Sequence, residues 1–252
     1  MNCDDAMNRR SGLLLAGTGT AVAVAAAHVA PAVTSWRALR CWATPALAGL
    51  GRPDHVALTF DDGPDPSSTP AFLRQLDELG WKATFFLLGS MARQAPDLAA
   101  EVVGRGHEVG VHGDDHRSHL RYGPAAVLRD LEQARAAIVE ATGVEPRWFR
   151  PPYGTLSSSS LRAARQLGLQ TVLWTAWGRD WRAEATADSV AREVARGLRP
   201  GATVLLHDSD CTSAPRCWRS ALGALPLLAE VFEHQGLRPG PLAEHGLPAE
   251  AA

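Results

Sequence analysis

The chain has 252 residues, 46% of them hydrophobic, which is enough to bury one substantial core in a single domain. Its formal net charge is −2, and without a long basic run the charge excludes electrostatically driven binding of nucleic acids or polyphosphates. A neutral or mildly charged substrate fits better. Eight tryptophans against two tyrosines are unusual. Aromatic faces beside polar groups suit sugar rings, and the alternative is that most of these indoles fill the core.

The N-terminus resembles an export signal or an uncleaved membrane anchor. Arg9 and Arg10 precede an uncharged apolar stretch at 11–27, which is the order of charge and hydrophobicity that such segments have. The stretch is rich in Ala and Gly rather than Leu, which favours a signal over a transmembrane helix, and the paired arginines leave a twin-arginine route open. We assign 1–33 to this signal or anchor and the proline-containing segment 34–53 to a linker. The protein is then secreted or held at the cell surface.

Alternating short apolar runs and longer segments of helical period begin at about residue 55. Repetition of this unit predicts a parallel sheet with helices outside it, either a barrel or an open doubly wound sheet. The predicted strands are 55–60, 82–88, 107–111, 147–150, 169–174 and 202–206, with a weaker one near 237–242. The predicted helices are 69–79, 90–104, 124–142, 158–167, 187–198 and 216–235.

Polar residues follow these strands at their carboxyl ends. Asp61 and Asp62 close the first strand, and an unpaired buried carboxylate is so costly that at least one should face solvent, a metal or a substrate. Active sites of parallel α/β barrels form where the carboxyl ends of the strands converge, so we predict one here. The other strand ends carry His112 and His116, Arg150, Asp180 and Trp181, and His207 and Asp208.

Two of these histidines have the spacing of metal ligands. His112 and His116, together with one carboxylate of the aspartate pair, would form a three-ligand set that leaves a position open for water on a zinc-like ion. The spacing alone is a weak signal, since His119, Asp114 and Asp115 lie nearby as alternatives.

The cysteines do not suggest a metal site, because the chain contains no CxxC spacing. Cys211 and Cys217 lie in a Ser/Asp/Thr/Pro-containing segment. In an exported protein this pair could form a local disulfide, and two free thiols are an equally good interpretation.

These polar motifs resemble those of a known family, the polysaccharide deacetylases with a NodB homology domain, carbohydrate esterase family four. The resemblance runs in order over roughly residues 54–240. The matching segments are Thr-Phe-Asp-Asp-Gly-Pro at 59–64, His-Gly-Asp-Asp-His at 112–116, Arg-Pro-Pro-Tyr-Gly at 150–154 and Leu-Leu-His-Asp at 205–208.

The resemblance implies a distorted seven-stranded (β/α) barrel, with one NodB-like catalytic domain at 54–243 and a tail at 244–252. By matching positions, it implies that the metal ligands are Asp62, His112 and His116. The metal would be divalent, usually zinc in this family, with cobalt, nickel and manganese also accepted by such a ligand set.

The resemblance also implies roles for the remaining residues. Asp61 would be the general base and His207 the general acid. Arg150 would orient Asp61, and the backbone N–H of Tyr153 would help to hold the oxyanion. The acetyl methyl group would lie in a pocket shaped by Trp181 and Leu206.

Two positions depart from the family pattern. Gly113 replaces the usual Ser or Thr whose hydroxyl holds the loop between the two histidines, which predicts looser metal geometry. Trp177 stands where an aspartate that tunes the acid histidine is common, which leaves Asp180 or Asp208 as possible substitutes. We therefore expect a pH profile or a substrate that differs from those of better-matched members.

The implied activity is metal-dependent removal of N-acetyl, or sometimes O-acetyl, groups from a cell-wall or related polysaccharide such as peptidoglycan or chitin oligomers. Two alternatives stay open: a weak or inactive carbohydrate-binding homologue, and a small-amide hydrolase of the same fold. A glycoside hydrolase is disfavoured, because its carboxylates stand about 5–10 Å apart across the glycosidic bond, and sequence neighbours cannot straddle it. The sequence does not predict the oligomeric state.

Overall fold

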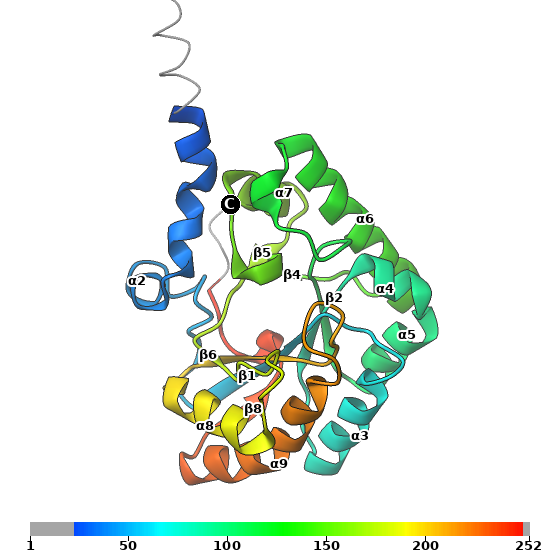
Figure 1. Cartoon of the computed structure of the whole chain (residues 1–252), viewed down its shortest axis with the longest axis vertical. Helices are drawn as coiled ribbons and strands as arrows, with labels where there is room; N and C mark the ends of the chain where they lie inside the picture. The colour runs from blue at the N-terminus through cyan, green and yellow to red at the C-terminus, as the bar shows by residue number, and fades with distance from the viewer. Residues whose placement is uncertain (1–22, 249–252) are drawn as a thin grey trace, which may run out of the picture.

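Eight strands form one parallel sheet in this computed structural model. The sheet curls into a distorted, incompletely closed barrel with helices outside it (Figure 1). The structure describes residues 23–248. The strand order is β5-β4-β3-β2-β1-β7-β6, and β8 pairs with β1. This confirms the predicted barrel-like α/β fold. The strands are β1 His55–Asp61, β2 Thr84–Leu87, β3 Glu108–Val111, β4 Trp148–Phe149, β5 Gln170–Thr171, β6 Ala176–Trp177, β7 Thr203–His207 and β8 Arg238–Gly240.

The central strand β1 is buried along its whole length, as expected for a parallel strand covered on both sides. It pairs with β7 from Ala57 to Asp61, with β2 from Thr59 onward and with β8 at its amino end. Phe60 lies within the core, stacked on Phe85 with ring centroids 5.0 Å apart. This apolar packing fixes where β1 ends, and therefore where the aspartates that follow it lie.

The outer helices begin and end largely where Gly and Pro predicted. Helix α3 ends at Gly80, and α6 begins at Pro124 and ends at Gly143, with both glycines in the left-handed conformation. The single helix predicted at 90–104 is wrong. Two helices replace it, because the ring of Pro96 cannot continue the turn before it. The helices are α2 Arg37–Ala43, α3 Thr69–Leu79, α4 Gly89–Gln94, α5 Pro96–Gly104, α6 Pro124–Thr142, α7 Ser158–Gln166, α8 Ala187–Gly197 and α9 Trp218–His234, with short 3-10 turns at Ala30–Ser35, His119–Arg121, Pro152–Gly154 and Leu242–Glu244.

The sheet is open between β5 and β6, its two edge strands. The strand predicted at 169–174 is shorter than expected, because the backbone N–H of Leu173 donates to the carbonyl of Leu47 at 2.8 Å instead of to another strand. Sequence analysis missed β6, which has only two residues.

The segment 34–53, expected to be a linker, packs against this opening. It contains helix α2, and the Arg40 side chain is 4% exposed. The Arg40 guanidinium donates to the carbonyls of Thr34 and Trp174, and Ala48 is fully buried. The segment therefore closes the barrel where the sheet itself does not.

The described residues include nearly all of the C-terminal end of the chain but only part of the N-terminal end. At the C-terminus, His245 and Leu247 are buried, so the start of the expected tail belongs to the packed domain. Most of the predicted signal or anchor lies outside the described residues. Within the described range, no helix is long and apolar enough to cross a membrane.

Arg40→Ala should lower the free energy of unfolding by about 2–3 kcal/mol, because two backbone carbonyls lose a charged donor and one of them lies inside the barrel opening. Urea denaturation measures the change. The control is Arg37→Ala, which removes an exposed arginine of the same helix that donates to one carbonyl, Thr175. Equal losses in the two variants would contradict the role given to Arg40.

Candidate active site

The predicted site residues meet at the carboxyl ends of the strands. Asp61 ends β1, with Asp62 directly after it, and His112 follows β3. Arg150 follows β4, and His207 ends β7. The register aligns Asp61 with His207 on the neighbouring strand, so the proposed base and acid lie at the same level of the barrel.

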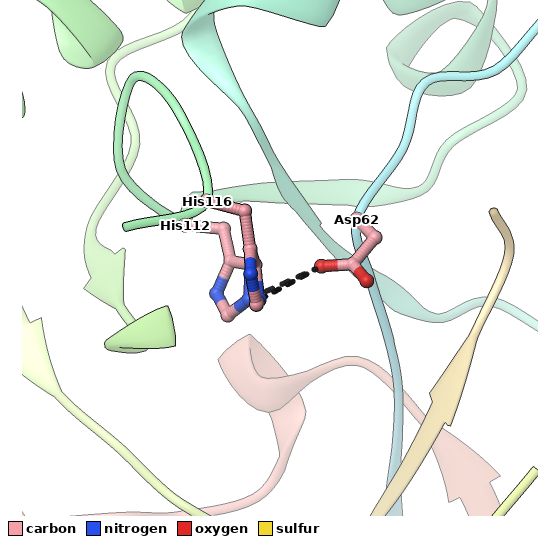
Figure 2. Close-up of side chains that lie close together, drawn as sticks. All are labelled: Asp62, His112 and His116. Carbon is pink, nitrogen blue, oxygen red and sulfur yellow. Dashed lines mark ion pairs between the residues drawn. The ribbon is translucent and has the colours of Figure 1, made fainter. Parts of the chain in front are cut away.

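Asp62, His112 and His116 form a compact group of possible metal ligands (Figure 2). Asp62 Oδ1 lies 3.3 Å from His112 Nε2 and 3.4 Å from His116 Nε2. One ligand atom from each residue falls within 4.8 Å of the others. Two imidazoles and a carboxylate are a donor set that zinc and related divalent ions accept.

The hydrogen bonds around this group fit a metal. His112 Nδ1 lies 2.8 Å from the carbonyl of Arg150, so it carries the proton and leaves Nε2 free to coordinate, the usual arrangement for a ligating histidine. Asp62 Oδ1 is buried and has no hydrogen-bond partner among the described residues. Its other oxygen accepts from Thr212 at 3.1 Å. A buried carboxylate oxygen without a donor indicates a cation site.

The pKa shifts are consistent with that assignment. Burial alone would raise the pKa of Asp62, but the close contact with the His112 imidazole and the charges of the nearby imidazoles hold it well below its ordinary value. Burial lowers the pKa of His116 to about 4, so its ring is neutral near pH 7 with a lone pair to offer. For His112, the Asp61 and Asp62 charges outweigh burial and raise the pKa. A metal would therefore displace a proton from His112.

The loop between the two histidines does not depend on a hydroxyl after His112. Gly113 has φ +94°, a conformation that L side chains rarely adopt. Asp114, the next residue, makes a bidentate pair with Arg93 of α4, with both N···O distances 2.8 Å. The backbone N–H of Asp114 also donates to Asp130 at 3.2 Å. Charge pairing therefore holds this loop without a hydroxyl, and the looser metal geometry expected from Gly113 stays a prediction.

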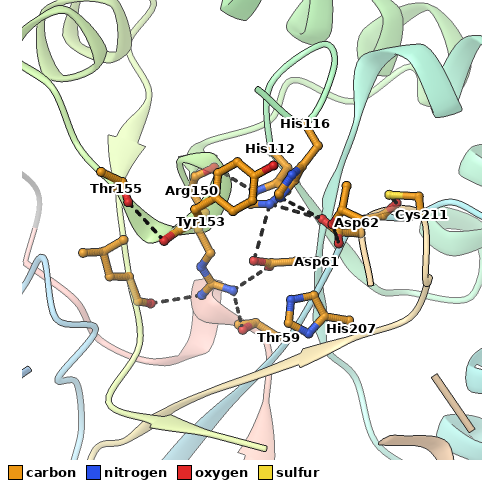
Figure 3. A network of polar contacts seen from close by, with 12 residues as sticks. Thr59, Asp61, Asp62, His112, His116, Arg150, Tyr153, Thr155, His207 and Cys211 are labelled. Carbon is orange, nitrogen blue, oxygen red and sulfur yellow. Dashed lines mark hydrogen bonds and ion pairs between the residues drawn. The ribbon is translucent and has the colours of Figure 1, made fainter. Parts of the chain in front are cut away.

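Asp61 is held by Arg150, which is fully buried (Figure 3). Arg150 Nη1 donates to Asp61 Oδ1 at 2.8 Å and to Thr59 Oγ1 at 2.7 Å, while Nη2 donates to the carbonyl of Leu173. Burial lowers the pKa of Arg150, and the Asp61 charge opposes that shift. Asp61 Oδ2 remains directed toward the metal-ligand group, 3.7 Å from His112 Nε2.

His207 is paired with Asp180, one of the two residues that could substitute for the aspartate missing at Trp177. Asp180 Oδ1 lies 3.0 Å from His207 Nδ1, and Oδ2 accepts from the His207 backbone N–H at 2.7 Å. Burial disfavours the imidazolium, but the Asp180 carboxylate outweighs it and raises the pKa of His207 to about 10. Asp208 instead accepts from Thr69 and lies away from this pair. Asp180 therefore pairs with His207 although Trp177 stands where the family commonly has an aspartate.

A cavity of about 370 Å³ opens above these residues. We call it the catalytic cavity. Trp181 lines it as predicted, and so does Tyr153, whose ring packs edge-on against His116 at 4.4 Å. Leu206 does not line it. Alternation along β7 places Leu206 in the core, and Leu205, two positions from His207, faces the cavity instead. The cavity is lined by Asp61, His112, His116, Tyr153, Gly154, Trp174, Trp177, Trp181, Leu205, His207, Thr212 and Ser213.

Several lining residues were not identified from sequence. Trp174 was not assigned to the site, and Trp177 was named only as a departure from the family pattern. Thr212 and Ser213 lie in the loop after β7, and their only signal was a Ser- and Thr-containing stretch directly following a strand.

Cys211 and Cys217 are free thiols, which decides between the two interpretations of this pair. Burial raises the pKa of Cys211 to about 12 and that of Cys217 to about 11. Neither is a thiolate near neutral pH, and neither belongs to the group of metal-ligand side chains found among the described residues.

The sequence profile described as "Polysaccharide deacetylase" matches residues 49–172. A chitooligosaccharide deacetylase from Bradyrhizobium is 36% identical over 200 residues, covering 75% of this chain and 89% of the relative. The chain belongs to the polysaccharide deacetylase family. The first motif, the histidine pair and the Arg-Pro-Pro-Tyr-Gly segment all lie within the matched range.

Other members of the polysaccharide deacetylase family differ in length. The peptidoglycan-N-acetylglucosamine deacetylase PgdA of Listeria monocytogenes is 37% identical over 159 residues. That alignment covers 63% of this chain and 33% of the relative, so the chain matches only about a third of that protein.

Solved polysaccharide deacetylase structures share the fold. The Bc1960 peptidoglycan N-acetylglucosamine deacetylase superposes with a TM-score of 0.75 at 27% identity, covering 84% of this chain and 98% of that one. A family 4 carbohydrate esterase from Streptomyces lividans, in complex with acetate, gives 0.68 at 30% identity, with coverages of 79% and 98%. BA3943 from Bacillus anthracis, described as a pseudoenzyme of the same family, gives 0.69 at 27% identity, with coverages of 76% and 65%.

Asp180→Asn should lower the pKa of His207 from about 10 toward its ordinary value in the metal-free protein, since the variant removes the paired charge. NMR titration of the imidazole measures the shift. A raised folded-state pKa stabilises the fold fully below the unfolded value of about 6.5. The loss of stability in the variant is therefore largest below that pH and shrinks as the pH rises toward 10. The control is Asp188→Asn, which alters an exposed carboxylate. A stability difference independent of pH would contradict the pairing.

Proposed function

We propose that the protein is a metal-dependent deacetylase that hydrolyses N-acetyl groups on a cell-wall or related glycan. The single observation that carries the proposal is the juxtaposition of three metal-ligand side chains with a buried Asp61 held by Arg150 and a His207 held by Asp180. Metal binding, base and acid then fall to different residues, and the base and the acid each have a partner that orients them.

Asp62, His112 and His116 would hold the metal, which when bound polarises the acetyl carbonyl and acidifies water. Asp61 Oδ1 is occupied by Arg150, so Oδ2 is the oxygen available to take a proton from the attacking water. Because the arginine fixes the carboxylate, little reorganisation is needed during the reaction.

His207 would donate a proton to the leaving amine from the other side of the catalytic cavity. Its raised pKa keeps the imidazole charged in the resting site, which is the protonation state that a general acid needs. Asp180 accepts from Nδ1, so Nε2 is the nitrogen left to deliver the proton.

Two side chains would shape the acetyl position. Leu205 and Trp181 both line the catalytic cavity, and the Trp181 ring lies 5.8 Å from that of His207 in an edge-on arrangement. The backbone N–H of Tyr153 stays our proposal for oxyanion binding. Tyr153 has φ +60°, and such strained backbone is often found at functional sites.

A catalytically inactive carbohydrate-binding protein remains the second candidate, since BA3943 shows that pseudoenzymes occur on this fold. Intact Asp61 and His207, each with its orienting partner, favour the enzyme. We also propose that the protein acts outside the cytoplasm, on the strength of the arginine-led apolar stretch at 11–27.

Asp61→Asn should lower kcat for acetate release about 10²- to 10⁴-fold while the protein still binds one metal ion, because the base is not a ligand. Acetate release is measured on peptidoglycan, chitin oligomers and acetylxylan, with and without chelator and added zinc. Asp62→Asn is the matched variant and should lose both the metal and the activity. Thermal melting of both variants checks that the fold persists. Full activity in chelator would refute metal dependence.

Arg93→Ala should weaken zinc binding about tenfold, since the pair with Asp114 fixes the loop that carries both histidines. Calorimetric titration with zinc measures the affinity. The control is Arg117→Ala, which removes an exposed pair with Asp115 from the same loop and should leave the affinity unchanged. Equal weakening by both variants would show that Arg93 has no special role.

A further inference from the structure

A second cavity of about 460 Å³ adjoins the catalytic cavity. We call it the arginine cavity. The two share one wall, because Tyr153, Gly154, Trp174 and Trp177 line both. The Trp177 ring lies between those of Trp174 and Trp181, tilted to both, with ring centroids 6.0 Å and 5.2 Å away. A glycan whose acetylated sugar enters the catalytic cavity can therefore extend over this aromatic wall into the arginine cavity.

The arginine cavity carries an excess of positive charge. Its charged lining residues are Arg37 and Arg40 from α2, Arg179 from the loop after β6, and Glu193 and Arg196 from α8. Four guanidinium groups thus face one carboxylate. The chain as a whole has net charge −2, so this local excess is not a reflection of composition.

Two of these arginines have donors without acceptors. Arg40 is 4% exposed, and its Nε has no hydrogen-bond partner among the described residues. No carboxylate in the described range forms an ion pair with Arg40, and burial lowers its pKa to about 10. Arg179 Nε also lacks a hydrogen bond, although the Arg179 side chain is 40% exposed and forms an ion pair with Glu193 at 3.7 Å. A buried, unpaired guanidinium donor is costly to maintain.

Arg179 is also held in an unusual backbone conformation, with φ +51°, which a non-glycine residue rarely adopts. Its guanidinium lies 5.1 Å from the centre of the Trp177 ring, on the wall that the two cavities share. Strained residues of this kind cluster where a ligand is bound. The strained backbone and the Nε donor without a hydrogen bond both belong to Arg179, which lines the arginine cavity.

We propose that the arginine cavity binds a carboxylate on a sugar next to the one that is deacetylated, so that the protein prefers an anionic glycan, as in peptidoglycan, to a neutral chitin oligomer. A guanidinium offers parallel N–H donors in the geometry that a carboxylate accepts. The proposal rests on the proposed function, since the acetylated sugar of the same glycan would occupy the catalytic cavity.

The test compares kcat/KM for acetate release from three glycans of equal length. The first is a peptide-free peptidoglycan strand with free lactyl carboxylates, the second is the same strand with those carboxylates converted to amides, and the third is a chitin oligomer. The wild-type protein should prefer the free carboxylate, and the preference should fall as salt rises. Equal values for the first two strands would overturn the inference and leave the proposed function standing.

Variants that remove a positive or a negative charge from the arginine cavity provide a second test. Arg196→Gln should lower the preference about two- to fivefold, the range for one exposed ion pair, and Arg196→Lys should restore most of it. Glu193→Gln removes the one competing carboxylate and should raise the preference. The control Arg219→Gln alters an exposed arginine that lines neither cavity and should leave it unchanged. Shifts of the same sign in the Arg196 and Glu193 variants, or a loss shared by all three glycans, would overturn the inference.

A binding measurement distinguishes failure of this inference from failure of the proposed function. Tryptophan fluorescence titration of the full chain with each glycan needs no turnover, and the shared wall contains the reporters. If no glycan releases acetate but the carboxylated strand still binds more tightly than its amide, the proposed function fails and the arginine cavity is confirmed. Equal binding of the two strands would overturn the arginine cavity whatever the activity.

Discussion

The buried charge of Arg150 is the constraint on which the site depends. A fully buried guanidinium is tolerated only when its donors are paired, and here the partners come from widely separated parts of the chain. Arg150 Nη1 donates hydrogen bonds to Asp61 and Thr59 on β1, and Arg150 Nη2 donates one to the carbonyl of Leu173 after β5. The Phe86 ring lies 4.1 Å from the guanidinium carbon. Three strands must therefore be correctly placed before this charge is satisfied, and satisfying it fixes the orientation of the base.

The segment before β1 contributes to the same arrangement through Leu173 and Trp174. Leu173 donates its N–H to Leu47, and the carbonyl of Trp174 accepts from Arg40. Because the Leu173 carbonyl accepts from Arg150, closure of the barrel opening and orientation of the base share one short stretch of backbone. A segment that the sequence describes as a linker therefore contributes to the geometry of the candidate site and supplies part of the arginine cavity.

What could be predicted from the sequence were the features encoded locally. The helices at 69–79 and 124–142 have the predicted bounds, because proline and glycine mark their ends, and the strand ends carrying Asp61, His112 and Arg150 follow from apolar periodicity. The prediction that Leu206 faces the cavity was wrong, because an uninterrupted apolar run has no polar residue to show which side chains face the cavity. The pair of Arg93 with Asp114 joins residues 21 positions apart, and no local sequence pattern identifies it. For His207, 27 positions from Asp180, the sequence left Asp180 and Asp208 as alternative partners, and only the fold distinguishes them.

The two cavities carry charge of opposite sign on either side of the aromatic wall that they share. On one side, Asp61, Asp62 and Asp180 concentrate negative charge that raises the pKa of His207 and favours a cation. On the other side, four arginines concentrate positive charge around a single carboxylate. Trp174, Trp177 and Tyr153 separate these fields, and interactions across a low-dielectric wall are weakly screened. A glycan lying across that wall would encounter a cationic acid and metal at the acetyl group and guanidinium donors one sugar away. In the proposed binding mode, this charge pattern would favour one placement of a glycan whose neighbouring sugars differ in charge, whereas a neutral polymer would gain nothing from the arginines.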